Sequence, residues 1–276
     1  MRLRTEQKLP ALALVITLLL TALTLTGCSG GASNTITEAG STTVQPVAEK
    51  LAEAYRAKNP DINITIQGGG SSVGIKSCND GTVDIGAASR ELKSTEPNLI
   101  KHLIARDGIA IVTHPSNPVR GLTKEQVRGV FSGNITKWSQ VGGQNKEIHV
   151  IAREEGSGTR TAFEEMIMGD ALVKASTILL PSSGAIRTAV SSDPQAIGFI
   201  SFGYIDTSVK ALTINSVAAT AHNASDGTYP LVRPLYFLTK TQPTGLVKEF
   251  IDFCLGTEGQ SIVAEEGYIP GGQPSH

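Results

Sequence analysis

Short runs of β-branched and aromatic residues alternate along this chain with segments of helical periodicity, and no other feature constrains its fold as strongly. In the segment 47–59, Leu51, Ala54 and Tyr55 repeat at the three- and four-residue spacing of one helix face. Strands are expected at residues 63–67, 107–114, 147–153, 196–201 and 231–240. Strands that alternate with helices predict an α/β fold with helices on both faces of its sheet.

Two further helical segments have recognisable ends. Thr123 precedes a periodic segment and Gln126 follows three residues later, which is the spacing of a capping box. Residues 244–269 read as one or two helices with a break near Gly256.

Prolines follow two of the strand-like runs, where a residue without an amide hydrogen prevents further pairing. They lie in the segments 112–118 and 232–236. We interpret these segments as two chain crossings between a discontinuous domain and an inserted one. The resulting domain prediction is lobe 1 at residues 35–114 plus 234–276, and lobe 2 at residues 115–233.

The N-terminal residues 1–27 are predicted to be a signal peptide and not part of the fold. A basic start precedes an apolar run of 15 residues at 11–25, shorter than the roughly 20 that a spanning helix needs. The run ends in Leu-Thr-Gly-Cys, which resembles a bacterial lipobox and predicts that Cys28 carries acyl chains such as palmitate. Residues 28–34 would then tether the protein to the cell membrane, outside the cytoplasm. The alternative is an ordinary signal peptide with a chance cysteine.

Charge and composition exclude several classes of function. Without residues 1–27 the chain keeps 21 Lys and Arg against 24 Asp and Glu, a formal net charge of −3. That balance argues against a nucleic-acid partner, and an anion would have to be held by local donors. The five histidines are scattered without metal-ligand spacing. Cys78 and Cys254 are either a disulfide or two buried thiols, and the sequence does not decide between them.

Three clusters of glycine and hydroxyl residues each precede a predicted helix. They occupy residues 40–43, 68–72 and 156–159, and Arg153 and Arg160 flank the third. Glycine lets a ligand approach the main chain, and the first amides of a helix lack intrahelical acceptors and attract anions. Plain N-capping explains any one cluster equally well. Three such units in one chain favour an anion site where helix N-termini converge at a sheet edge.

The same clusters lack the groups that catalysis requires. Glu155 stands where a GxSxG elbow needs glycine, no histidine lies near any cluster, and no P-loop pattern is present. The sequence therefore predicts static anion binding and no enzymatic activity.

Several stretches in the same order resemble the phosphate-binding component of a high-affinity phosphate ABC importer. The resemblance covers residues 36–270 and implies a type II periplasmic-binding-protein fold, with a ligand cleft between two lobes and two hinge crossings. It also implies capture of inorganic phosphate by a monomer that delivers it to permease and ATPase subunits, without a cofactor. The stretches are residues 39–46, 68–76, 84–92, 131–143, 152–163, 183–204 and 265–270.

The resemblance implies ligand residues from all three clusters. The first cluster supplies Thr42 and Thr43, with Ser41 close by, and the second supplies Ser71. The third supplies Arg153, an arginine four residues before a Ser-Gly-Thr, together with Ser157, Gly158 and Thr159. Ser72 and Arg160 have weaker claims.

One position departs from the family pattern. Some members carry an aspartate that accepts the proton of bound phosphate, and counting from Asp84 places Ser89 there. A serine also accepts a proton but lacks the charge that repels sulfate, so rejection of sulfate is less certain. Arg90 is either a second cation at the site or a solvated side chain. The alternatives to a phosphate receptor are a receptor for sulfate or molybdate, a phosphatase-type enzyme, and an adhesion or sensing protein.

Overall fold

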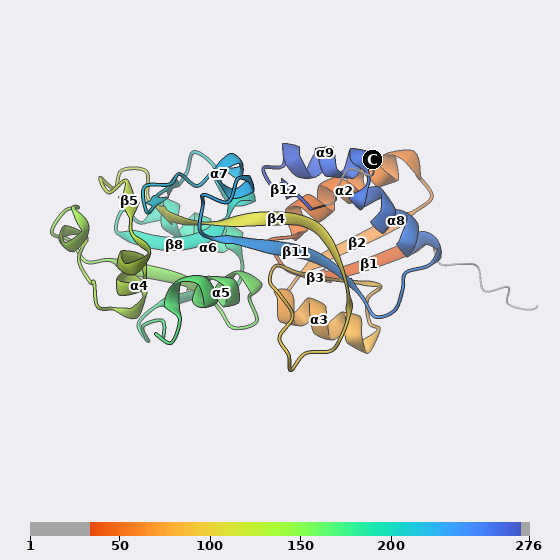
Figure 1. Ribbon diagram of the computed structural model, residues 1–276, viewed down its shortest axis with the longest axis horizontal. Coiled ribbons are helices and arrows are strands. Elements are labelled where there is room, and N and C mark those ends of the chain that lie inside the picture. The colour runs from red at the N-terminus through yellow and green to blue at the C-terminus, as the bar shows by residue number, and fades with distance from the viewer. Residues whose placement is uncertain (1–33, 272–276) are drawn as a thin grey trace, which may run out of the picture. The chain divides into compact units, whose positions relative to one another are not determined.

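The structure, a computed structural model, describes residues 34–271, and Figure 1 shows their arrangement. Within this range no helix is both long enough and apolar enough to cross a bilayer. The predicted signal peptide, Cys28 and nearly all of the tether lie outside the described residues.

Lobe 1 combines the first and the last elements of the described chain. Helices α2 and α3 follow β1 and β2, and α8, α9 and β12 return to the same lobe after β11 (Figure 1). The bounds are β1 Thr35–Gly40, α2 Gln45–Lys58, β2 Asn63–Gly68, α3 Ser71–Asp80, β3 Ile85–Ala88, α8 Gly245–Leu255, α9 Thr257–Glu265 and β12 Ile269–Pro270.

Lobe 2 holds the intervening elements, packed around strands β6, β7 and β8. The bounds are β5 Gly121–Leu122, α4 Lys124–Ser132, η2 Trp138–Val141, β6 His149–Arg153, α5 Gly158–Phe163, η3 Glu164–Met168, β7 Ile178–Leu180, α6 Ser183–Ser192, β8 Ala196–Ser201, η4 Phe202–Tyr204, β9 Lys210–Ala211, β10 Thr213–Ile214 and α7 Ala221–Ser225.

Two long strands, β4 (Ile100–Thr113) and β11 (Val232–Thr239), connect the lobes (Figure 1). They pair antiparallel in the middle of one sheet whose order is β2-β1-β3-β11-β4-β8-β6-β7. Along β4, Ile104 belongs to the apolar cluster of lobe 1 and Ile109 to that of lobe 2. The lobe boundaries remain a proposal, and this change of cluster favours a first crossing near Asp107, earlier than residue 114.

The predicted elements are present, with shifts at their ends. All five predicted strands are confirmed as β2, β4, β6, β8 and β11, although β4 begins at Ile100 and not at Asp107. Thr123 and Gln126 form the predicted capping box, since each side chain accepts from the other residue's amide. Gly256 separates α8 from α9, as the predicted break requires, and is the cap residue of both helices. The α/β fold is thereby confirmed.

The two described cysteines are free and buried. Cys78 lies in a small apolar cluster on α3, and its thiol donates to the carbonyl of Leu238. Cys254 lies on α8 in the core of lobe 1. Of the two possibilities left by the sequence, the pair of buried thiols is the one observed.

Candidate functional site

The three Gly/Ser/Thr clusters meet where the lobes face each other. Thr43 Oγ1 lies 3.0 Å from Thr159 Oγ1, and the amide of Ser72 donates to the carbonyl of Gly156 at 3.1 Å. A Cβ added to Gly158 would lie only 2.1 Å from Ser71 Oγ. The convergence expected from the sequence is therefore present within the described residues.

Glycine is required where β1 passes into the first cluster. Gly40 has a φ of 145°, and a Cβ there would lie 2.2 Å from the carbonyl oxygen of Ala87 on β3. The chain then turns through Ser41, whose Oγ accepts from the amide of Thr43 at 3.2 Å. Helix α2 follows with Pro46 in its first turn.

Thr42 has a free hydroxyl next to this turn. Thr42 is buried, and its Oγ1 has no hydrogen-bond partner among the described residues. The carbonyl of Thr42 accepts from Tyr204 Oη at 2.6 Å, which ties the first cluster to lobe 2. Burial raises the pKa of Tyr204 to about 12, so this phenol remains a donor at neutral pH.

The second cluster brings Ser71 and Ser89 together. Gly70 has a φ of 91° and leads into α3, which begins at Ser71. Ser71 Oγ accepts from the amide of Ser89 at 3.0 Å and lies 3.4 Å from its hydroxyl. Ser89 Oγ also accepts from Ser41 Oγ at 2.9 Å. All three hydroxyls are buried.

In the third cluster, the cap uses a side chain and leaves backbone amides at the helix start available. Ser157 caps α5, because its Oγ accepts from the amide of Arg160 at 3.2 Å. Gly158 and Thr159 form the first turn behind this cap and are buried. Their amides have no acceptor within the helix, and α5 continues directly into η3. The N-capping interpretation is correct for Ser157 and leaves the positive end of this helical segment available.

Arg153 ends β6 at the same place and is only 2% exposed. It donates to the carbonyl of Pro181 at 2.7 Å and to Ser183 Oγ at 3.4 Å, and its Nε has no partner among the described residues. The salt bridges of the described chain do not include Arg153. Burial, and then the charge of Arg233, lower the pKa of Arg153 to about 10, so the guanidinium stays charged at neutral pH.

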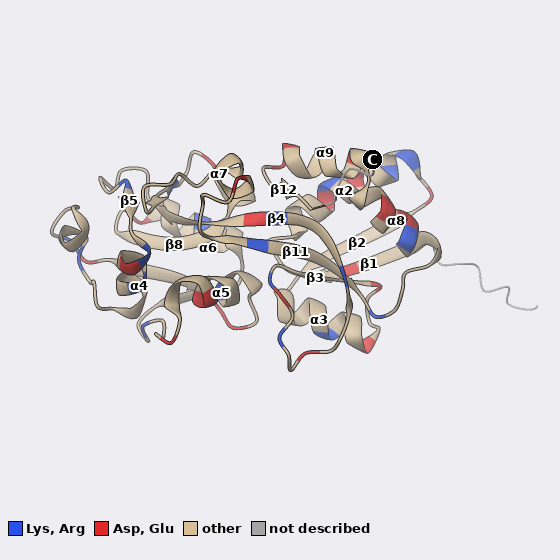
Figure 2. Cartoon of the chain, viewed as in Figure 1, with Lys and Arg blue, Asp and Glu red and all other residues tan. Residues whose placement is uncertain are grey.

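Sequence reasoning missed Arg233 and Asp107, which lie opposite each other on the two crossing strands. Arg233 Nη2 lies 2.9 Å from Asp107 Oδ2, and Figure 2 shows the basic segment of β11 beside the acidic segment of β4. Arg233 also donates to Ser89 Oγ at 3.3 Å and to Thr43 Oγ1 at 3.2 Å. The signal in the sequence was a single arginine in the mostly apolar strand β11 and an aspartate directly before the apolar run of β4.

Arg90 is not a solvated side chain, and a carboxylate balances its charge. It is 2% exposed and forms a salt bridge of 2.6 Å with Glu96. The same Nη2 also donates to Ser72 Oγ at 3.3 Å, so Ser72 helps to hold Arg90. Arg160 is likewise paired, with Glu164 on the next turn.

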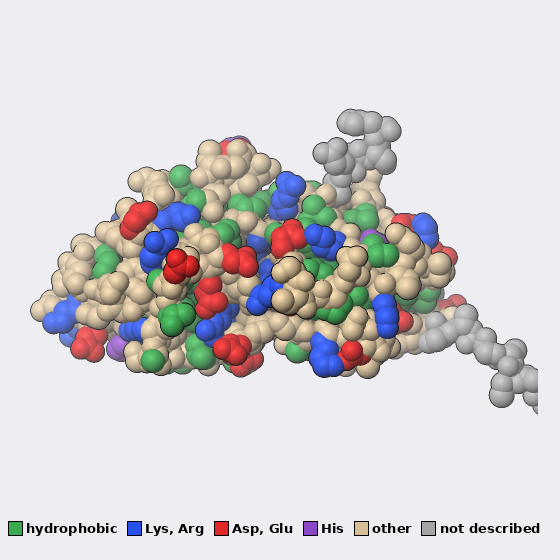
Figure 3. All heavy atoms as spheres, turned by 60° about the horizontal axis from the view of Figure 1, so that its bottom comes forward, with side chains coloured by type: hydrophobic (Ala, Val, Ile, Leu, Met, Phe, Trp, Pro, Cys, Tyr) green, Lys and Arg blue, Asp and Glu red, His purple; other side chains and the backbone are tan. Residues whose placement is uncertain are grey.

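The face of the protein shown in Figure 3 has no large basic patch that would attract an anion. Lysine, arginine, aspartate and glutamate side chains are interspersed over that face without a large field of one sign. This pattern agrees with a formal net charge of −1 for the whole sequence. This face therefore provides no general positive potential to hold an anion, which leaves that role to local donors.

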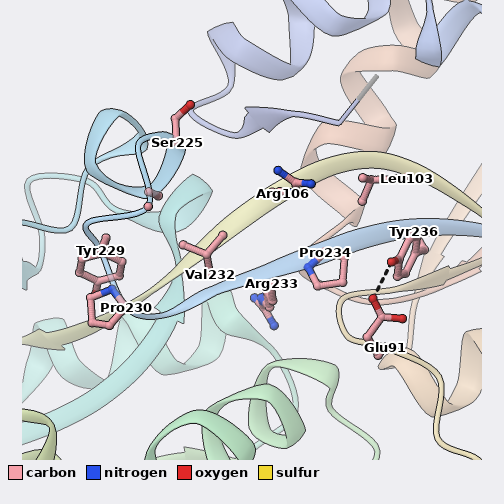
Figure 4. Close-up of a pocket in the computed structure, with 12 residues that line it drawn as sticks. Glu91, Leu103, Arg106, Ser225, Tyr229, Pro230, Val232, Arg233, Pro234 and Tyr236 are labelled. Carbon is pink, nitrogen blue, oxygen red and sulfur yellow. Dashed lines mark hydrogen bonds between the residues drawn. The ribbon is translucent and has the colours of Figure 1, made fainter. Parts of the chain in front are cut away.

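A cavity of about 560 Å³ lies along the crossing strands (Figure 4). Glu91 lines it and accepts from Tyr236 Oη at 2.6 Å, and Leu103, Val232 and Pro234 supply apolar walls. Figure 4 shows Arg233 and Arg106 pointing to opposite sides of the strands. The cavity is lined by one carboxylate and two arginines, and none of its described side chains is a buried donor without a partner, so the hydroxyl cluster is the better anion site.

Comparison with known proteins identifies the family of this chain. Residues 28–258 match the family model described as a PBP superfamily domain. The chain is 34% identical over 245 residues to the phosphate-binding protein PstS of Bacillus subtilis, covering 87% of this chain and 81% of that protein.

Two solved structures resemble the described fold. One is a substrate-binding protein of a phosphate ABC transporter from Clostridium perfringens, with bound phosphate. It is 41% identical with a TM-score of 0.83, over 86% of this chain and 99% of that one. A phosphate transport receptor from Vibrio cholerae is 38% identical with a TM-score of 0.71, over 85% and 99%.

Proposed function

This chain belongs to the PBP superfamily and, within it, to the PstS phosphate-binding proteins, and on that premise we propose that it captures inorganic phosphate outside the cytoplasm for an ABC importer. The permease and ATPase subunits of that importer are its partners. The chain acts as a monomer, and acyl chains on Cys28 hold it at the membrane.

The observation that carries the proposal is a pair of buried donors without partners at the point where the clusters meet. Thr42 Oγ1 and Arg153 Nε are both enclosed and both lack a hydrogen-bond acceptor among the described residues. Such a group costs about 1–3 kcal/mol when it stays unsatisfied. A tetrahedral oxyanion supplies acceptors for both at once.

The remaining contacts follow from the same cluster. Thr43, Ser71, Gly158 and Thr159 complete the ligand shell, and Ser41, Ser89 and Ser157 hold these donors in place. Ser72 and Arg90 act from outside through their contact with each other.

The energetics are adequate for tight binding. Removing an anion from water costs several kcal/mol even after relaxation. Each charge-assisted hydrogen bond returns about 1.5–3 kcal/mol, so six donors fixed in advance offset the cost. The cluster is closed over by contacts between the lobes, such as that of Ser72 with Gly156, which excludes water. Opening about β4 and β11 would admit and release the ligand.

We expect no enzymatic turnover. Apart from that of Thr42, the hydroxyls at the site are hydrogen-bonded to other hydroxyls, to arginine or to backbone amides. None of their partners among the described residues is a histidine or carboxylate that could act as a base. A phosphatase assay that detects hydrolysis proportional to protein concentration would contradict this expectation.

The decisive experiment is isothermal titration of the purified protein with inorganic phosphate, sulfate and molybdate. Saturable binding of one phosphate per chain supports the proposal. Binding of molybdate or sulfate without phosphate would replace it with a receptor for another oxyanion.

A further inference from the structure

Ser89 and its neighbours form a chain of hydroxyl groups in which the direction of each hydrogen bond can be worked out. A hydroxyl has one proton to donate and two lone pairs that accept. Ser89 Oγ accepts from Ser41 Oγ at 2.9 Å and from Arg233 Nη1 at 3.3 Å. Both of its lone pairs are therefore used.

This count fixes the next contact in the chain. In the 3.4 Å contact between the two hydroxyls, Ser89 is therefore the donor and Ser71 the acceptor. Ser71 Oγ already accepts from the amide of Ser89, so its lone pairs are used as well. The proton of Ser71 is left to point out of the chain, toward the place where the clusters meet.

Arg233 also donates to one member of a second pair of hydroxyls, those of Thr43 and Thr159. Its Nη2 donates to Thr43 Oγ1 at 3.2 Å, and Thr43 lies 3.0 Å from Thr159 Oγ1. Whichever of the two threonines donates to the other, one proton remains for a ligand. Asp107 holds Arg233 in this position, and Asp107 is itself fixed by Ser201 Oγ and the amide of Phe202.

We propose that Arg233, held by Asp107, is a positioning residue that turns the hydroxyl chain Ser41–Ser89–Ser71 into a hydrogen-bond donor, so that the site takes fully deprotonated tetrahedral dianions such as sulfate as well as phosphate. The inference rests on the proposed function. Ser89 cannot accept a hydrogen bond from the proton of bound phosphate. Thr42, a neutral hydroxyl without another partner, can both donate and accept, and it accepts this hydrogen bond. Neutral Thr42 does not repel sulfate.

Displacement titration tests the selectivity directly. In the unmodified protein we expect sulfate to displace phosphate with an affinity within about tenfold, because the two ions differ by one hydrogen bond. In the Ser89→Asp variant, which adds a carboxylate, sulfate binding should be lost while phosphate still binds. Failure of excess sulfate to displace bound phosphate overturns the inference and leaves phosphate capture intact. Failure of phosphate itself to bind overturns the proposed function first.

The role of Arg233 is tested with a charge-balanced double variant, Arg233→Gln with Asp107→Asn. Asparagine keeps an acceptor for Ser201 and Phe202, whereas glutamine is too short to reach both Ser89 and Thr43. The phosphate-to-sulfate affinity ratio should rise about fivefold, since Ser89 regains a lone pair for the phosphate proton. An unchanged ratio in a folded variant means that Arg233 is only structural.

Arg128→Gln is the matched control, because Arg128 Nε donates to the Ile167 carbonyl and not to the site. The phosphate-to-sulfate affinity ratio of this variant should equal that of the unmodified protein. If the double variant does not fold, the Ser89→Asp titration still decides the inference.

Discussion

The crossing strands and the inner edge of lobe 2 each hold a buried arginine, and the two arginines have different partners. Arg233 on β11 is 3% exposed and Arg153 at the end of β6 is 2% exposed. Arg233 faces the carboxylate of Asp107 at 2.9 Å. Arg153 donates only to a carbonyl and a hydroxyl, and its Nε has no partner in the described chain.

This difference separates a charge that is balanced within the protein from one that is not. A buried charge with a carboxylate partner is balanced within the protein, and its removal is felt as lost stability. A buried charge without one is costly until a ligand arrives, and its removal is felt as lost affinity. The two regions should therefore respond to substitution in opposite ways.

The largest effect is expected from Asp107→Asn, which leaves Arg233 without its counter-ion. Breaking one side of a buried pair costs about 3–5 kcal/mol. In a domain of this size each kcal/mol lowers the melting temperature by about 2–4 °C. Calorimetry without ligand measures the loss, and the double variant with Arg233→Gln should recover most of it. An unchanged melting temperature would show that the ion pair does not stabilise the fold.

Arg153→Ala should behave in the opposite way. Its melting temperature without phosphate should stay equal or rise, because an unbalanced buried charge is removed. Phosphate affinity should fall at least about tenfold, since a charge-assisted hydrogen bond is worth about 1.5–3 kcal/mol. Titration calorimetry measures the affinity. Arg160→Ala is the matched control, because Arg160 is paired with Glu164, and its affinity should stay close to that of the unmodified protein.

The fold was largely predictable because its signals are local. Hydrophobic periodicity gave the strands β2, β6, β8 and β11, and the Thr123 capping box set the start of α4. The early start of β4 was missed because residues 100–106 mix lysine, histidine and arginine with apolar residues. Their pairing with β11 decides that segment, and the pairing partner lies more than a hundred residues away.

The site was predictable in its clusters but not in its connections. Glycine and hydroxyl residues before helices marked Thr42, Ser71 and Thr159, since helix starts have a sequence signature. The partner of Arg90 could not be read from its neighbours, because Glu96 reaches it through the loop between β3 and β4. Arg233 was missed for a related reason: its contacts with Asp107 and Ser89 join residues that only the folded sheet brings together.

Gly158→Ala tests how closely the two regions approach each other. A new Cβ would lie 2.1 Å from Ser71 Oγ and 2.6 Å from Ser89 Oγ, so the closed arrangement must shift. Overpacking of this kind costs about 1–3 kcal/mol, and we expect phosphate affinity to fall about tenfold or more. Gly184→Ala in α6 is the control, because its Cβ meets no heavy atom closer than 3.6 Å. Equal affinities in the two variants would mean that the lobes need not touch here when phosphate is bound.

The smallest effect concerns the third buried arginine, Arg90, whose partner Glu96 is less enclosed. The hydrogen bond from Arg90 lowers the pKa of Glu96 below its ordinary value. A carboxyl of this kind stabilises the fold fully above its unfolded pKa of about 4.3, and the contribution disappears as pH falls through the lower folded pKa. Glu96→Gln should therefore lower the free energy of unfolding by about 1 kcal/mol at pH 7 and by almost nothing in acid, measured from urea midpoints.

The control is Glu53→Gln, at an exposed pair with Lys50, which should change the free energy of unfolding little at either pH. A cost for Glu96→Gln that does not change with pH would show that Glu96 acts through packing. Phosphate affinity should be unaffected in both variants, because neither side chain reaches the site.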